Sequence, residues 1–256
     1  MKSVKSVKCF LCAWAPAFRK TMKCCGTTNL FNVCIKMWNI AFRLISQTWQ
    51  NKENLLSDIM EKYISADDIR YQLANLKQLT FEVTDACNLK CKYCAYGEFY
   101  NDYDQRENKA LSLSAAIRLI DYLNAYWNSE WNMSQNRNVY ISFYGGEPLL
   151  NMPFIESVVA YVEKLHSPHR SFTFSMTTNA ILLEKHMDFL VAHGFNLLVS
   201  LDGNEYNTSY RVDHAGRPVF TDIVRNVDAL HRKYPDYFEK KVNFNAVLHN
   251  RNSVGD

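Results

Sequence analysis

Three cysteines stand close together in the segment DACNLKCKYC, at Cys87, Cys91 and Cys94. Thiolates at this spacing in a loop can converge on one metal centre. A tetrahedral zinc site would need a fourth cysteine or histidine nearby, but the next histidine is His166, far beyond zinc-finger spacing. Three ligands on a four-iron cluster would leave one iron open, which is a catalytic arrangement. Three unligated core cysteines are a poor alternative, because polar residues and lysines separate them.

The other cysteines all fall within the first 52 residues, at Cys9, Cys12, Cys24, Cys25 and Cys34. No cysteine follows Cys94, so a disulfide framework across the chain is not expected. Cys9 and Cys12 form a CxxC pair, which leaves a second metal site open as an alternative. No second CxxC completes a zinc set with that pair.

Charge is distributed unevenly along the chain. Residues 1–52 carry nine lysines or arginines and no acid, whereas the remainder is net acidic. This predicts an amphipathic or poorly ordered basic segment over 1–52, a helical linker over 53–75 and a globular core over 76–256. Nucleic acid is not an expected partner. The apolar run CFLCAWAPAF suits a signal-peptide core better than a membrane span, and no membrane association is expected.

Strands and helices alternate after residue 76. Period-two patterns predict strands over QLTFEVT, NVYISFY, SFTFSMTTN, FNLLVSLDG and KVNFNAVLH. Helical patterns lie between them, with Ser112 or Ser114 as one cap, Asn151 as the next, and ends at Gly194 and Pro235. The prediction is an α/β fold with a parallel sheet and right-handed crossovers. The cysteines and the motifs GGEP, TTN and SLDG then meet at the carboxyl ends of the strands.

The CxxxCxxC motif, with an aromatic residue before its last cysteine, resembles the radical SAM superfamily. By that resemblance Cys87, Cys91 and Cys94 are the ligands of a 4Fe-4S cluster, and Tyr93 lies beside the adenine of S-adenosylmethionine. The implied fold is a partial (β/α)6 barrel. Since five strands are predicted, we expect it to be incomplete, a fragment truncated before its last strand and any SPASM domain.

The segment YGGEPLL resembles the second motif of that superfamily. Gly145, Gly146 and Glu147 would then lie against the amino group of S-adenosylmethionine. Glycine permits a close backbone approach that a side chain forbids, and we expect the approach here to be toward the cofactor. An ordinary strand-to-helix turn is the alternative.

The segments TTNAILL and SLDG resemble the sulfatase maturases and peptide-modifying enzymes of the superfamily. The match implies that Asn179, Ser200 and Arg211 hold the ribose and carboxylate of the cofactor. Asn204 replaces the usual proline and NTSYR departs from the usual His-Asp pair, so a sulfatase maturase specifically is in doubt. Arg211 also has an alternative reading as a solvated loop charge.

The resemblance implies reductive cleavage of S-adenosylmethionine to a 5'-deoxyadenosyl radical, which modifies a peptide or protein. An electron donor such as flavodoxin or ferredoxin and a reducing cytoplasm are implied as well. Two alternatives stay open. One is a small-molecule enzyme like those of molybdopterin synthesis, and the other is a non-catalytic metal-binding remnant.

Overall fold

The computed structural model describes residues 64–97, 99, 106–134 and 137–253. The basic segment and its five cysteines lie outside these residues. The chain divides into two compact units, residues 1–65 and 66–256, and the elements below belong to the second. In chain order they are α4 Ala66–Ala74, β1 Gln78–Thr84, α5 Leu113–Trp127, β2 Arg137–Gly145, η1 Pro148–Asn151, α6 Met152–Glu163, β3 Arg170–Thr178, α7 Leu183–Ala192, β4 Asn196–Ser200, η2 Asn207–Tyr210, α8 Phe220–Lys233, α9 Pro235–Lys241 and β5 Val242–Asn245.

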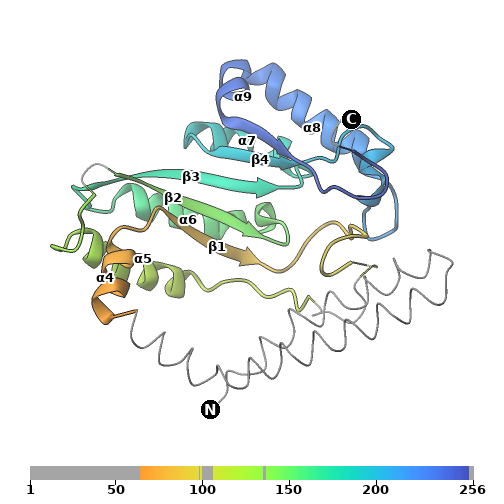
Figure 1. Cartoon of the computed structure of the whole chain (residues 1–256). Coiled ribbons are helices and arrows are strands. Elements are labelled where there is room, and N and C mark those ends of the chain that lie inside the picture. The colour runs from red at the N-terminus through yellow and green to blue at the C-terminus, as the bar shows by residue number, and fades with distance from the viewer. Residues whose placement is uncertain (1–63, 98, 100–105, 135–136, 254–256) are drawn as a thin grey trace, which may run out of the picture. The chain divides into compact units, whose positions relative to one another are not determined.

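The strands form a parallel sheet in the order β1-β2-β3-β4-β5 within the described part of the chain (Figure 1). Strand order therefore follows chain order. Each crossover moves the chain one strand further in the same direction, as in a (β/α) barrel and unlike a doubly wound sheet. The predicted α/β fold with a five-stranded partial barrel is confirmed.

One hydrophobic core joins the sheet to the helices. Alternate strand residues are buried, as period-two patterning requires: Phe81 and Val83, Val139, Ile141 and Phe143, Phe174 and Met176, and Leu197 and Val199. The same cluster contains the apolar stripes of α5, α6, α7 and α8. Since one set of alternate side chains meets all four helices, these helices cover one face of the sheet, and the described residues leave the other face uncovered.

Local signals set several element ends. The Ser112 hydroxyl accepts a hydrogen bond from the Ala115 N–H at 3.3 Å and caps α5, as predicted. Gly194 follows α7 with φ +61°, a conformation that favours glycine. Asn151 precedes α6, but its side chain makes no capping hydrogen bond with the described residues, and the short helix η1 leads into α6 instead.

One helix was not predicted, and one predicted boundary was wrong. Helix α8 stops at Lys233, just before Pro235 as predicted, but Pro235 also begins the unpredicted helix α9, because a proline without an N–H suits the first turn of a helix. The last predicted strand, over 241–249, shrinks to β5 Val242–Asn245. Its continuation leaves the ladder because the Val247 N–H donates to the Asp202 carboxylate at 3.0 Å.

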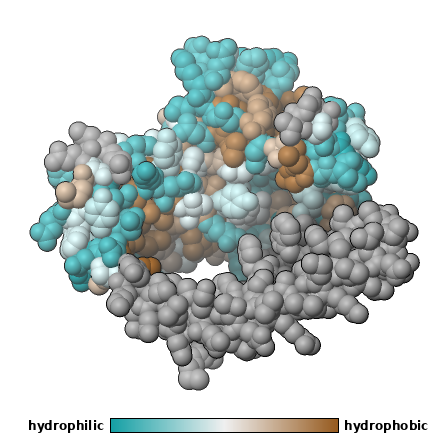
Figure 2. Space-filling view, in the orientation of Figure 1, coloured by the Kyte–Doolittle hydropathy of each residue, from teal (hydrophilic) through white to brown (hydrophobic). Residues whose placement is uncertain are grey.

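Hydrophilic residues cover much of the described surface in Figure 2, and apolar surface gathers near α9 and β5. The exposed apolar side chains after α9 include Phe244, Val247 and Leu248. A helix long and apolar enough to cross a membrane is not found among the described residues.

Candidate active site

The cysteine loop, residues 85–97, leaves the carboxyl end of β1 and pairs with a segment far along the chain. The Lys90 N–H donates to the Val212 carbonyl at 2.8 Å, and the Lys92 N–H donates to the Tyr210 carbonyl at 3.0 Å. Leu89, which precedes the first of these bonds and pairs with Asp213, is buried. The backbone of the loop is therefore held against residues 210–213 by hydrogen bonds of the protein itself.

Gly97 closes the cysteine loop in a tight turn. Its N–H donates to the Cys94 carbonyl at 2.7 Å, and the Cys94 N–H donates to the Cys91 carbonyl at 3.1 Å. A Cβ on Gly97 would lie 2.2 Å from the Cys91 carbonyl oxygen, far inside van der Waals contact. This position therefore requires glycine. Gly97 was not predicted as a site residue, although a glycine three residues after the last cysteine was the available signal.

The thiols of Cys87, Cys91 and Cys94 are free and half-buried. Burial raises the pKa of Cys91 to about 11; the positive charge of Arg211 opposes this shift, and the two neighbouring cysteines add to it. The bare Cys91 thiol is therefore protonated at neutral pH, and ligation would release its proton.

Three cysteine thiols on one loop are a donor set that an iron–sulfur cluster can use. Within the described residues no three His, Cys, Asp or Glu side chains are grouped as a single metal ion requires. In a cluster each cysteine binds a different iron, so the sulfurs stand further apart. Asp85 Oδ1 and Arg106 Nε are buried without hydrogen-bond partners among the described residues, which fits a polar or charged group held within this loop.

The two glycines of the GGEP turn pack against the start of the cysteine loop. A Cβ would lie 2.3 Å from the Thr84 carbonyl oxygen at Gly145, which also has φ +132°, and 2.1 Å from the Ala86 carbonyl oxygen at Gly146. The N–H of Gly146 donates to Thr84 at 2.8 Å and that of Glu147 donates to Ala86 at 2.9 Å. The close approach seen at both glycines is to the chain's own backbone, whereas the prediction from the sequence was an approach to the cofactor.

Glu147 joins the ends of two strands from inside the protein. Its buried carboxylate accepts hydrogen bonds from the Leu149 N–H at 3.1 Å, the Thr178 hydroxyl at 2.8 Å and the Asn179 N–H at 2.8 Å. Burial raises the pKa of Glu147 to about 7, and these three hydrogen bonds oppose the shift. The carboxylate therefore fixes the TTN segment beside the GGEP turn.

Asn179 reaches the cysteine loop, whereas Ser200 does not. The Asn179 side-chain N–H2 donates to Asn88 Oδ1 at 2.8 Å and to Cys87 Sγ at 3.7 Å. Ser200 ends β4 opposite Asn245 of β5, and in the described part of the chain no hydrogen bond joins its side chain to the other candidates.

Arg211 is 6% exposed and forms a two-point ion pair with Asp202, so the solvated-loop reading of this arginine was wrong. Its Nε and Nη2 donate to the Asp202 carboxylate at 3.0 and 2.8 Å. The Tyr93 hydroxyl donates to the same carboxylate at 2.5 Å. Burial raises the pKa of Tyr93 while Arg211 opposes the shift, so the phenol stays a donor. Asp202 was missed as a site residue, although it lies within SLDG.

The Tyr93 ring lies between polar and aromatic neighbours. The Arg211 Cζ is 5.5 Å from its centroid, and the His249 ring stacks on it with centroids 5.7 Å apart. Tyr210 meets it edge-on at 6.3 Å. The segment after β5 thus contacts the aromatic residue of the cysteine loop, which nothing in the sequence pattern indicated.

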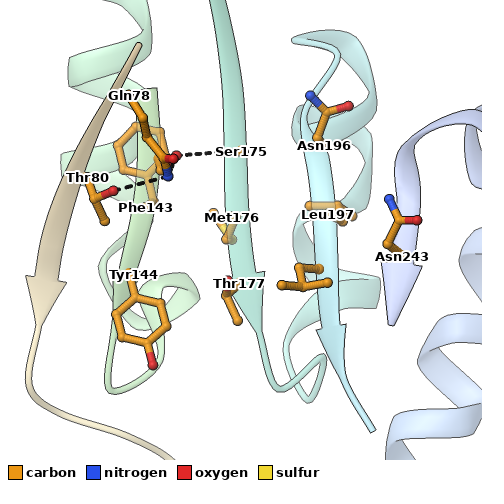
Figure 3. A pocket seen from close by; sticks show the side chains of 12 residues that line it. Gln78, Thr80, Phe143, Tyr144, Ser175, Met176, Thr177, Asn196, Leu197 and Asn243 are labelled. Carbon is orange, nitrogen blue, oxygen red and sulfur yellow. Dashed lines mark hydrogen bonds between the residues drawn. The ribbon is translucent and has the colours of Figure 1, made fainter. Parts of the chain in front are cut away.

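The uncovered face of the sheet carries a groove of about 250 Å³ (Figure 3). The Gln78 side chain donates to the Ser142 hydroxyl at 2.9 Å, and the Ser142 and Ser175 hydroxyls are 2.6 Å apart. Asn196 and Asn243 line its far side. No charged side chain is among the described residues that line the groove, so it can bind neutral polar groups through hydrogen bonds.

The parallel strand order and the cysteine loop at the carboxyl end of β1 define a radical SAM type of barrel. The family model of the radical SAM superfamily matches residues 81–253, more than half of the chain, and the chain belongs to this superfamily. An enzyme is therefore expected from family membership as well as from geometry.

Among proteins of similar sequence is the cysteine-type anaerobic sulfatase-maturating enzyme of Clostridium novyi, 27% identical over 64% of this chain and 43% of that enzyme. The GTP 3',8-cyclase of Synechocystis is 29% identical over 62% of this chain and 42% of the cyclase. The chain spans less than half the length of these two curated relatives.

A solved structure, native anSMEcpe with bound AdoMet, superimposes with a TM-score of 0.54 at 24% identity. The match covers 67% of this chain and 43% of that chain. At this identity the likeness concerns the fold, and it agrees with the order of strands in Figure 1.

Proposed function

We propose that this chain holds a 4Fe-4S cluster on Cys87, Cys91 and Cys94 and uses S-adenosylmethionine to modify a peptide or protein. The observation that carries the proposal is the position of the three thiols on one loop at the carboxyl end of β1, which hydrogen bonds hold against residues 210–213. When bound, the cluster and S-adenosylmethionine supply one-electron cleavage of a carbon–sulfur bond and hydrogen-atom abstraction from the substrate.

Tyr93 is proposed to lie beside the adenine. Its hydroxyl is held by Asp202 and its ring is stacked with His249, so the ring is positioned before any ligand arrives. Arg211 is proposed to attract the cofactor carboxylate from a fixed position. Its ion pair with Asp202 uses Nε and Nη2, and the guanidinium has further donors on Nη1.

The turn of Gly145, Gly146 and Glu147 is proposed to meet the cofactor amino group through backbone atoms. Both carboxylate oxygens of Glu147 already accept hydrogen bonds within the protein, which supports a backbone role over a side-chain role. Asn179 and Ser200 are proposed to hold the ribose and carboxylate. Asn179 has the stronger support, because its amide lies beside Cys87 and Asn88.

The polar groove supports a peptide or protein substrate. Its hydroxyl and amide side chains can form hydrogen bonds with peptide groups. The Clostridium novyi relative is, by its name, an enzyme that acts on a sulfatase. The likeness to a GTP cyclase favours a small-molecule substrate as the second candidate. A triphosphate is usually bound by arginine or lysine, and the described lining of the groove has neither. A flavodoxin or ferredoxin is the proposed electron donor.

The experiment is an anaerobic assay of the iron-reconstituted chain with S-adenosylmethionine and dithionite. We expect 5'-deoxyadenosine by mass spectrometry, and more of it when a cysteine-containing peptide is added, together with a mass change in that peptide. Stimulation by GTP and not by peptides would select the small-molecule alternative. Bound zinc in place of iron, with no 5'-deoxyadenosine, would support a non-catalytic metal-binding protein and contradict the proposal.

A further inference from the structure

Arg106 places a guanidinium beside two of the three cysteine thiols. Its Nη2 donates to Cys94 Sγ at 3.3 Å. Burial lowers the pKa of the Arg106 guanidinium, but the nearby Cys87 and Cys94 thiols raise it above its usual range. The Cζ lies 4.8 Å from the centroid of the Tyr96 ring, which supports the planar group from one side. Arg106 belongs to none of the motifs on which the superfamily resemblance rests.

The positive charge of Arg106 is not neutralised by an ion pair in the described part of the chain. Its neighbour Glu107 pairs with Lys109 instead, and the Glu107 N–H donates to Asp85 Oδ2 at 2.8 Å. The buried Nε of Arg106 has no hydrogen-bond partner among the described residues. A guanidinium stays protonated at any pH at which the protein is folded. A charge without an ion-pair partner among the described residues is therefore held permanently against the Cys94 sulfur.

A charge in this position acts on the oxidation state of an iron–sulfur cluster. Adding one electron makes the cluster more negative, and hydrogen bonds to the cysteine sulfurs, together with nearby charge, set its reduction potential. A cation that donates to ligand sulfurs stabilises the reduced cluster more than the oxidised one. Among the described residues, Arg106 is a cation that donates to a cysteine sulfur of this loop, at Cys94.

We propose that Arg106 raises the reduction potential of the cluster and so makes its reduction by a one-electron donor easier. The inference rests on the proposed function, because it needs a cluster on the three cysteines. Arg106 itself takes neither an electron nor a proton. The electron passes from the external donor to the cluster, and the arginine changes the relative energy of the two charge states.

The test compares Arg106→Gln, which removes the charge and keeps a donor, with Arg106→Lys, which keeps the charge. Arg225→Gln is the matched control, because Arg225 is 61% exposed and pairs with Asp222 on α8. Each full-length protein is reconstituted anaerobically, its iron is counted, and its midpoint potential is measured by EPR against dithionite with mediators.

In Arg106→Gln we expect a tenfold smaller ratio of reduced to oxidised cluster at a fixed potential. This corresponds to a midpoint potential about 59 mV lower than that of the wild type for a one-electron couple. Arg106→Lys should fall between it and the wild type, and Arg225→Gln should match the wild type. An unchanged potential in Arg106→Gln would overturn the inference. Loss of iron from a folded Arg106→Gln chain would overturn it as well, since the residue would then be needed for assembly. A wild-type chain that holds no iron would instead defeat the proposed function.

Discussion

Replacing Asp202 with alanine removes the acceptor of four hydrogen bonds at the carboxyl end of β4. These come from the Tyr93 hydroxyl, from Nε and Nη2 of Arg211, and from the Val247 N–H. The side chains of Arg211 and Asp202 are 7% and 0% exposed, so water cannot replace the lost partner. Removing one member of such a buried pair costs about 3–5 kcal/mol, and we expect Asp202→Ala to lose this much free energy of unfolding.

A double-mutant cycle separates the ion pair from packing. Arg211→Met alone should be strongly destabilising, but the double variant should lose much less than the sum of the two, because neither charge is then left unpaired. Urea unfolding of all four chains gives the free energies. The control is Asp222→Ala in the exposed pair with Arg225, where we expect less than about 1 kcal/mol. Additive effects of the two substitutions, or an Asp202→Ala chain as stable as the control, would refute the reasoning.

Two further predictions concern the cysteine loop and its support. Gly97→Ala should lose most of the reconstituted iron, because its Cβ would meet the Cys91 carbonyl oxygen, whereas Gly216→Ala, with open space around it, should keep its iron. The pKa of the Glu147 carboxyl is about 7 in the folded protein and 4.5 at its ordinary value. As pH rises, the unfolded chain therefore loses this proton before the folded protein does. The contribution of Glu147 to the free energy of unfolding is therefore fully present below about pH 4.5 and is lost progressively up to about pH 7. Relative to Glu147→Gln, the unfolding free energy of the wild type should fall by about 3 kcal/mol across that window, and a pH-independent difference would contradict the assignment.

Local patterns were sufficient to predict the sheet and the position of the motifs. Period-two burial along Val139, Ile141 and Phe143 is visible in the sequence because it depends on nearest neighbours. Once the strands are parallel, the segments after them meet at one end by construction. The cysteines, the GGEP turn and Asn179 were therefore brought together as predicted, whereas helix α9 was not foreseen because Pro235 suits the end of one helix and the start of another.

The contacts that hold the site depend on residues far apart in the chain. Tyr93 and Asp202 are 109 positions apart, and the hydrogen bonds from the cysteine loop to residues 210–213 span a similar distance. Neither the hydrophobic period of a segment nor the spacing of residues within a motif predicts such long-range pairings. For the same reason Arg211 could be read as a solvated charge, although its partner Asp202 stands only nine residues away.

The central claim is that Cys87, Cys91 and Cys94 bind a cluster with one open iron. EPR of the dithionite-reduced, reconstituted chain, recorded with and without S-adenosylmethionine, tests it most directly. We expect about four irons per chain and the signal of a reduced 4Fe-4S cluster. That signal should change on addition of S-adenosylmethionine and be absent from Cys91→Ala. A signal that is indifferent to S-adenosylmethionine, or that persists in Cys91→Ala, would contradict the claim.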